Sequence, residues 1–240
     1  MFNACKIGNE AIVKYLAEHE ADISKENRKK ENSLFFSCES GNESVVKYLV
    51  EQGADINKEN KEQETSLFNA CKNGNEAIVK YLVEHGVDIN KENWEKKTSL
   101  FFACENGNES VVQYLVEQGA DINKINFYEE TLLFNAWKSG NEVLVNYFIE
   151  QGANINKKNN HNIISMYKAW ENGNEVLVKY LIEQGADINK KYNHNIISMY
   201  KAWENGNEVL IKYFVEHSAY KDNVNLLRKL HYFMHVKMKI

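Results

Sequence analysis

The residue pair best suited to chemistry is His231 and His235, four positions apart near the C-terminus. Two histidines at this spacing share one face of a helix and could ligate a metal ion. A zinc site needs at least three protein ligands, however, and no third one lies nearby. Carboxylate pairs such as Glu129 and Glu130 recur beside lysines in polar loops. This pattern is typical of solvated hairpin tips. We therefore expect no metal and no cofactor.

The most frequent motif, Gly-Asn-Glu, also lacks the features of a catalytic or phosphate-binding loop. It begins at Gly8, Gly41, Gly74, Gly107, Gly140, Gly173 and Gly206. A phosphate loop has several glycines and a following Lys-Ser or Lys-Thr, neither of which is present. Catalysis needs one unique arrangement of side chains, whereas nearly every polar residue here has copies. We therefore predict that the chain is not an enzyme.

The Gly-Asn-Glu motif recurs every 33 residues. The side chains are therefore positioned by a structural unit that repeats with this period. A second motif, Gly-Ala-Asp-Ile-Asn, keeps the same step from Gly53 to Gly185, with Val87 and Asn154 as single changes. A fixed period of this length predicts one supersecondary unit stacked in a linear array.

The four cysteines occupy one equivalent site in successive units, at Cys5, Cys38, Cys71 and Cys104. Stacked helices lie roughly 8–10 Å apart, and a disulfide needs its Cα atoms within about 7 Å. We therefore expect the cysteines to be unpaired. Buried free thiols are typical of a reducing compartment, so we expect a cytoplasmic protein, with the nucleus as the alternative.

Composition excludes several classes of protein. Hydrophobic residues make up 43% and charged residues 26% of the 240 residues, as in a soluble folded protein. The net charge of −5 argues against a nucleic-acid partner, because phosphate contacts require a basic face. The sequence has no apolar run near 18 residues, which predicts no membrane span. Its first ten residues do not read as a secretory signal.

A single unit can be read from residues 60–92. A first helix over 65–73 opens at a Thr or Ser cap and stops at Gly74, because glycine accepts the left-handed conformation there. Asn75 is a good N-cap for a second helix, whose apolar residues have helical spacing. Gly86 ends that helix, and a polar hairpin loop leads to the next unit.

A 33-residue helix–turn–helix–hairpin with Thr-x-Leu-x-x-Ala, a central glycine and a closing Gly-Ala-Asp-x-Asn resembles the ankyrin repeat. The resemblance covers about residues 1–223 and implies an all-α solenoid of stacked helix-turn-helix units joined by hairpin loops. The chain departs from the family in having no proline. It also has Phe or Tyr in place of the family histidine, which predicts a ladder of packed rings. The family's hairpin glycine is replaced at Lys30, Gln63, Lys96, Glu129, Asn162 and Asn195.

The period divides the chain into a repeat array over 1–224 and a tail over 225–240. The array comprises a truncated unit 1–26, then units 27–59, 60–92, 93–125, 126–158, 159–191 and 192–224. The tail has apolar residues on one helical face and several lysines. It is predicted to be a basic amphipathic helix that caps the last unit. The alternative is that it lies on a membrane surface.

The family resemblance implies a protein-interaction scaffold or adaptor that binds its partner on the concave side, on hairpin tips and first helices. Three aromatic residues, Trp94, Phe127 and Tyr128, have no apolar counterpart in earlier loops and are predicted to anchor a protein partner. Their alternative role is local packing of one hairpin onto its neighbour. Further partner-binding residues are predicted at Lys61, Glu62, Lys97, His161 and His194.

Two other functions remain open from the sequence. The chain could be a fragment or targeting array of a larger multidomain regulatory protein, because its first unit begins part-way through the repeat. It could also be a peripheral membrane protein that binds through its tail. The main prediction is a monomeric adaptor that binds protein and not nucleic acid, with a membrane role disfavoured.

Overall fold

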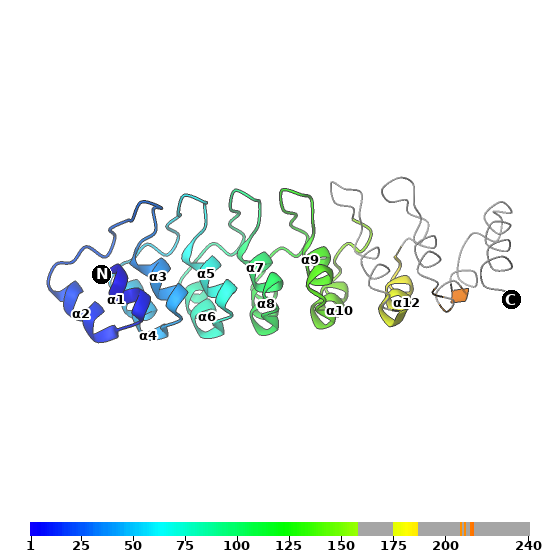
Figure 1. Ribbon diagram of the computed structural model, residues 1–240, viewed down its shortest axis with the longest axis horizontal. Helices are drawn as coiled ribbons and strands as arrows, with labels where there is room; N and C mark the ends of the chain where they lie inside the picture. Colours follow the sequence, from blue (N-terminus) through cyan, green and yellow to red (C-terminus); the bar gives the residue numbers. More distant parts are fainter. Residues whose placement is uncertain (158–174, 187–206, 208, 210–211, 214–240) are drawn as a thin grey trace. The chain divides into compact units, whose positions relative to one another are not determined.

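The computed structural model describes residues 1–157, 175–186, 207, 209 and 212–213 (Figure 1). The chain divides into two compact units, Met1–Asn154 and Ile155–Ile240. Every regular element in the described residues is an α-helix, beside one isolated bridge between Ile125 and Thr131. The predicted all-α fold class is therefore confirmed. The predicted tail over 225–240 lies outside the described residues.

Five helix pairs build the unit Met1–Asn154. Their bounds are α1 Phe2–Ile7 and α2 Glu10–Glu18, α3 Ser33–Ser40 and α4 Glu43–Glu51, α5 Ser66–Asn73 and α6 Glu76–Glu84, α7 Ser99–Glu105 and α8 Glu109–Glu117, α9 Leu132–Ser139 and α10 Glu142–Glu150. First helices pack on first helices, from α1 on α3 to α7 on α9, and second helices α2, α4, α6 and α8 pack in the same order. The connecting loops rise on one side of these pairs (Figure 1). In the other unit, α12 spans Glu175–Glu183.

The Gly-Asn pair between the two helices of a repeat has two separate roles. Gly74 has φ +70°, and this left-handed conformation ends α5. The side-chain oxygen of Asn75 accepts a hydrogen bond from the Ile78 N–H at 3.1 Å and so caps α6. Its side-chain nitrogen donates to the carbonyl of Gly41, one repeat earlier, at 3.0 Å. The motif therefore starts a helix and joins neighbouring repeats at the same time.

The core runs along the helix pairs and includes the cysteine site. The four cysteine thiols are buried and free. Burial raises the pKa of Cys104 to about 12, so this thiol stays neutral and packs as a small apolar group. Trp137 occupies the same site in the fifth repeat and is only 3% exposed.

The aromatic ladder differs from its prediction. Phe35, Phe68 and Phe101 are buried. In the described residues, however, the phenylalanine ring pairs between repeats are Phe2–Phe36 and Phe68–Phe102, with centroids 5.3 and 5.5 Å apart. The prediction of a continuous ladder of equivalent rings is therefore wrong. Each pair joins a ring of the predicted ladder to the residue after the equivalent position in the following repeat, where phenylalanine alternates with asparagine over the first five repeats.

Candidate interaction surface

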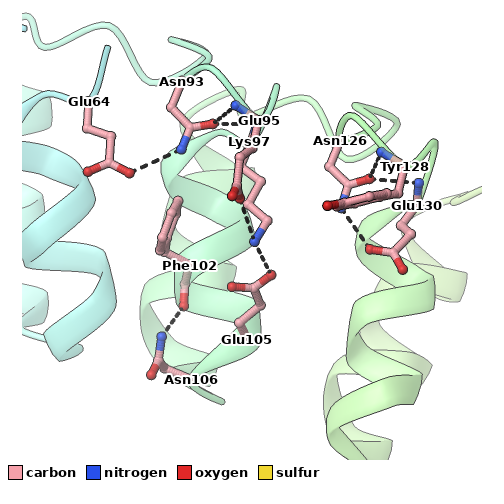
Figure 2. A network of polar contacts seen from close by, with 10 residues as sticks. All are labelled: Glu64, Asn93, Glu95, Lys97, Phe102, Glu105, Asn106, Asn126, Tyr128 and Glu130. Carbon is pink, nitrogen blue, oxygen red and sulfur yellow. Dashed lines mark hydrogen bonds and ion pairs between the residues drawn. The ribbon is translucent and has the colours of Figure 1, made fainter. Parts of the chain in front are cut away.

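Each of the four hairpins that the structure describes is built around one asparagine at its base. In the fifth repeat the side-chain oxygen of Asn126 accepts the backbone N–H groups of Tyr128 and Glu130 at 2.9 and 3.0 Å. Its side-chain nitrogen donates to the Glu130 carboxylate at 2.8 Å (Figure 2). Asn27, Asn60 and Asn93 accept the same two backbone hydrogen bonds in their own repeats. The asparagine therefore closes the turn by side-chain hydrogen bonds.

The hairpins adopt a left-handed turn although they lack the family glycine. Lys30 and Gln63 have φ +63°, Lys96 has φ +57° and Glu129 has φ +58°. Such angles are unfavourable for residues with a Cβ atom. The left-handed conformation is stabilised by the side-chain hydrogen bonds of the basal asparagine and by the backbone hydrogen bonds of the hairpin.

Neighbouring hairpin tips are joined by backbone hydrogen bonds. The donor–acceptor pairs are Lys61 N to Lys29 O at 2.9 Å, Trp94 N to Glu62 O at 3.1 Å and Phe127 N to Glu95 O at 2.7 Å. We call the joined tips, residues 28–30, 61–63, 94–96 and 127–129, the hairpin rim. These bonds fix the order and the spacing of the side chains on the rim.

Three exposed aromatic side chains form the apolar part of the rim. Trp94 is 67% exposed, Phe127 is 65% exposed and Tyr128 is 49% exposed. The rings of Phe127 and Tyr128 meet edge to face, with centroids 5.7 Å apart. We call these three residues the aromatic cluster. Exposure of this extent means that local packing leaves much of their apolar surface open to solvent.

Lys97 has a different environment from the rim residues. Its side chain is 17% exposed and forms ion pairs with Glu105 at 3.0 Å and Glu95 at 3.2 Å (Figure 2). Its ammonium also lies 5.5 Å from the ring centroid of Phe102. Burial alone would lower the pKa of Lys97, but Glu105 and Glu95 outweigh it and the pKa is raised. Lys97 therefore ties its hairpin to helix α7.

Lys97 also changes the hydrogen bonding of its own hairpin. Glu31, Glu64 and Glu130 stand at the equivalent position in the other repeats, and each accepts a hydrogen bond from its basal asparagine. In the fourth repeat Asn93 instead donates to Glu64 of the preceding repeat, at 3.1 Å. Glu64 thus links two successive hairpins.

The other predicted partner-binding residues fall in two groups. Lys61 and Glu62 are exposed on the rim, one repeat before Trp94. His161 and His194 lie outside the described residues, as do His231 and His235. No group of three or more His, Cys, Asp or Glu side chains that could hold a metal occurs among the residues that the structure describes. In the same residues, no helix is long and apolar enough to cross a membrane.

Sequence reasoning missed the basal asparagines and the partners of Lys97. The asparagines recur at 27, 60, 93 and 126 with the same 33-residue step as the glycines, and this signal could have identified them. Glu105 lies eight residues beyond Lys97 on the following helix, and no repeated pattern joins the two. Beside them, a hollow of about 350 Å³ between α7 and α9 is lined by Glu105, Asn135, Lys138 and Ser139.

A model of ankyrin repeats matches the chain in three copies, over residues 1–60, 54–126 and 124–192. The chain belongs to the ankyrin repeat family. Among solved structures, the ankyrin repeat domain of human ASB11 aligns with a TM-score of 0.75 at 21% identity. The alignment covers 82% of this chain and 89% of that domain. At this identity the likeness concerns the fold alone. No curated protein sequence matches the chain at a significant level.

Proposed function

We propose that this ankyrin repeat chain is a non-enzymatic adaptor that binds a partner protein on its hairpin rim and first helices. Ankyrin repeats are in general protein–protein interaction modules. The observation that carries the proposal is the aromatic cluster, in which three large rings on two adjacent hairpins are each about half or more exposed. Aromatic side chains of this kind supply most of the affinity in many interfaces.

The rim suits binding because its conformation is set before a partner arrives. Each tip is held by its basal asparagine, and each is bonded to the next tip through the backbone. A partner would therefore lose little free energy in ordering this surface. Charged residues such as Lys61 and Glu62 lie on the tip bonded to Trp94 and would contribute selectivity.

The proposal extends to the organisation of the chain. We infer seven repeats with the boundaries given above, because the 33-residue step continues to Gly206 in the sequence. The chain would act as a monomer inside the cell, in the cytoplasm or the nucleus. The four buried free thiols support a reducing compartment.

The test is affinity capture from native cell extract with the wild type and the variant Trp94→Ala, Phe127→Ala, Tyr128→Ala. We expect the variant to lose the captured partner, because removing such anchors costs a few kcal/mol of binding free energy. The matched control is Ile12→Ala, Tyr15→Ala, Val143→Ala, which removes one ring and two aliphatic side chains on second helices, where Ile12, Tyr15 and Val143 are 48%, 59% and 51% exposed.

Two outcomes distinguish the possibilities. A partner retained by the wild type and the control but lost by the cluster variant supports the proposal. Equal retention by all three proteins would remove the aromatic cluster from the binding site. Melting curves by circular dichroism should coincide for the three proteins, because all six substituted side chains are exposed.

A further inference from the structure

The rim changes in character from one end to the other. The first tip position, which is equivalent in the four hairpins, is occupied in order by Arg28, Lys61, Trp94 and Phe127. All four side chains are exposed. Two cations are thus followed by two aromatic rings along one row.

The positive charge is concentrated on the first tip. Arg28, Lys29 and Lys30 are consecutive and exposed, and none of them forms an ion pair within the part of the chain that the structure describes. The neighbouring carboxylate, Glu31, accepts a hydrogen bond from Asn27 at 2.7 Å at the base of the hairpin. Three cations on one short turn repel one another and are stabilised by an anionic partner.

From these observations we infer that the hairpin rim binds an extended peptide segment of the partner, with acidic residues at one end and large apolar residues at the other. The acidic end would contact Arg28, Lys29 and Lys30, and the apolar end would contact the aromatic cluster. The inference rests on the proposed function and specifies the chemistry of its partner.

The spacing of the rim sets the length of this segment. Successive repeats stack roughly 8–10 Å apart, so the first tip lies two to three steps, about 16–30 Å, from the aromatic cluster. An extended chain rises about 3.3 Å per residue. The acidic and apolar groups of the peptide should therefore be separated by about five to nine residues.

A nucleic acid fits the same rim poorly. Its phosphates would continue past the first tip and meet the carboxylates of Glu62, Glu95 and Glu129, all exposed on the following tips. A phosphate chain next to these groups is repelled. A peptide with charge at one end only avoids this repulsion.

The experiment selects binders from a displayed library of random peptides of about twelve residues, a length that spans the rim. The full chain is the target, and the selected peptides are then titrated at about 50 and about 300 mM salt. We expect an acidic group at one end and Trp, Phe or Leu at the other, with tighter binding at low salt. An oligothymidylate of similar length is titrated in parallel.

Two variants separate the ends of the rim. Arg28→Glu, Lys29→Glu, Lys30→Glu should weaken the selected peptides roughly tenfold or more and remove most of the salt dependence. Trp94→Ala, Phe127→Ala, Tyr128→Ala should weaken them while the salt dependence remains. The matched control, Lys25→Glu, Lys157→Glu, Lys212→Glu, makes the same change in net charge at exposed positions outside the rim and the first helices and should have a smaller effect.

The outcomes separate this inference from the proposed function. The inference would be overturned if the selected peptides need the aromatic cluster but lack an acidic group. It would also be overturned if they bind the Arg28, Lys29, Lys30 variant unchanged. Either result leaves the adaptor function standing. An equal effect of the matched charge control would also overturn the inference, and so would an oligothymidylate that competes with the peptides. Peptides indifferent to the aromatic cluster would contradict both, whereas the absence of any enriched peptide would overturn the inference alone.

Discussion

At the residue scale, the hairpin tips carry an unfavourable backbone conformation. Lys30, Gln63, Lys96 and Glu129 have φ between +57° and +63°. The left-handed conformation costs a residue with a Cβ atom roughly 1–2 kcal/mol. The basal asparagines and the bonds between tips outweigh this cost, so the turn forms with a strained residue at every tip.

Replacing Gln63 by glycine should therefore stabilise the protein. The strain at φ +63° is removed, and the greater chain entropy of glycine in the unfolded state offsets part of the gain. We expect an increase of roughly 0.5–1 kcal/mol in the free energy of unfolding, measured in urea. Lys61→Gly is the control in the same exposed tip, because Lys61 is not among the residues with positive φ. It should be neutral or destabilising, and equal effects would contradict the argument.

At the scale of the elements, the sequence predicted the helices better than the hairpins. Gly74 and Asn75 mark the end of one helix and the start of the next because glycine and an N-cap each have one strong local role. The helix bounds follow from them. The hairpins lack glycine, and their conformation depends on basal asparagines bonded to residues that differ between repeats. Short-range sequence patterns therefore do not predict the hairpin conformation.

Other local expectations depended on contacts that a sequence does not contain. Thr65 lies at the N-cap of α5 as expected, but its hydroxyl has no hydrogen-bond partner, whereas Asn32 at the equivalent position accepts two. The exposure of Trp94 followed from its place in a polar tip. The burial of Lys97 did not, because it depends on Glu105 and Phe102 of the following helix.

A second set of asparagine side chains joins neighbouring repeats outside the hairpins. The side chain of Asn57 donates to the carbonyl of Gly86 at 3.2 Å and accepts the N–H of Asp88 at 2.9 Å. Asn90 makes the same pair of bonds to Gly119 and Asp121. This amide bridge explains why asparagine ends the Gly-Ala-Asp-Ile-Asn motif. Each bridge ties a repeat to the next one at a fixed offset.

The first repeat has Ser24 at this position, so Ser24→Asn should add a bridge. The local turn is already the same, because the N–H groups of Ser24 and Asn57 both donate to the aspartate two residues earlier. The new amide would reach Gly53 and Asp55, and two hydrogen bonds should add about 1 kcal/mol to the free energy of unfolding. Ser24→Asp is the control, because a carboxylate can accept from Asp55 but cannot donate to Gly53. Thermal unfolding that ranks Asp equal to Asn would exclude the bridge.

At the scale of the whole array, each repeat contacts mainly its neighbours, so stability should vary along it. Ile12 of α2 is 48% exposed, whereas Val45 of α4 and Ile78 of α6 at the equivalent position are fully buried. Few buried contacts favour local opening. We therefore expect backbone amides of α2 to exchange hydrogen faster than those of α4 and α6.

A core substitution should then show how far one repeat affects the others. Leu82 of α6 is fully buried, and Leu82→Ala should cost about 2–5 kcal/mol through the cavity it leaves. Because α6 packs on α4 and α8, hydrogen exchange should accelerate most in these three helices and less in α2. Leu16→Ala, the same change in α2, should accelerate exchange in α2 and α4 and leave α8 nearly unchanged. An equal acceleration of every helix by both substitutions would mean that the repeats open as one cooperative unit and not as coupled neighbours.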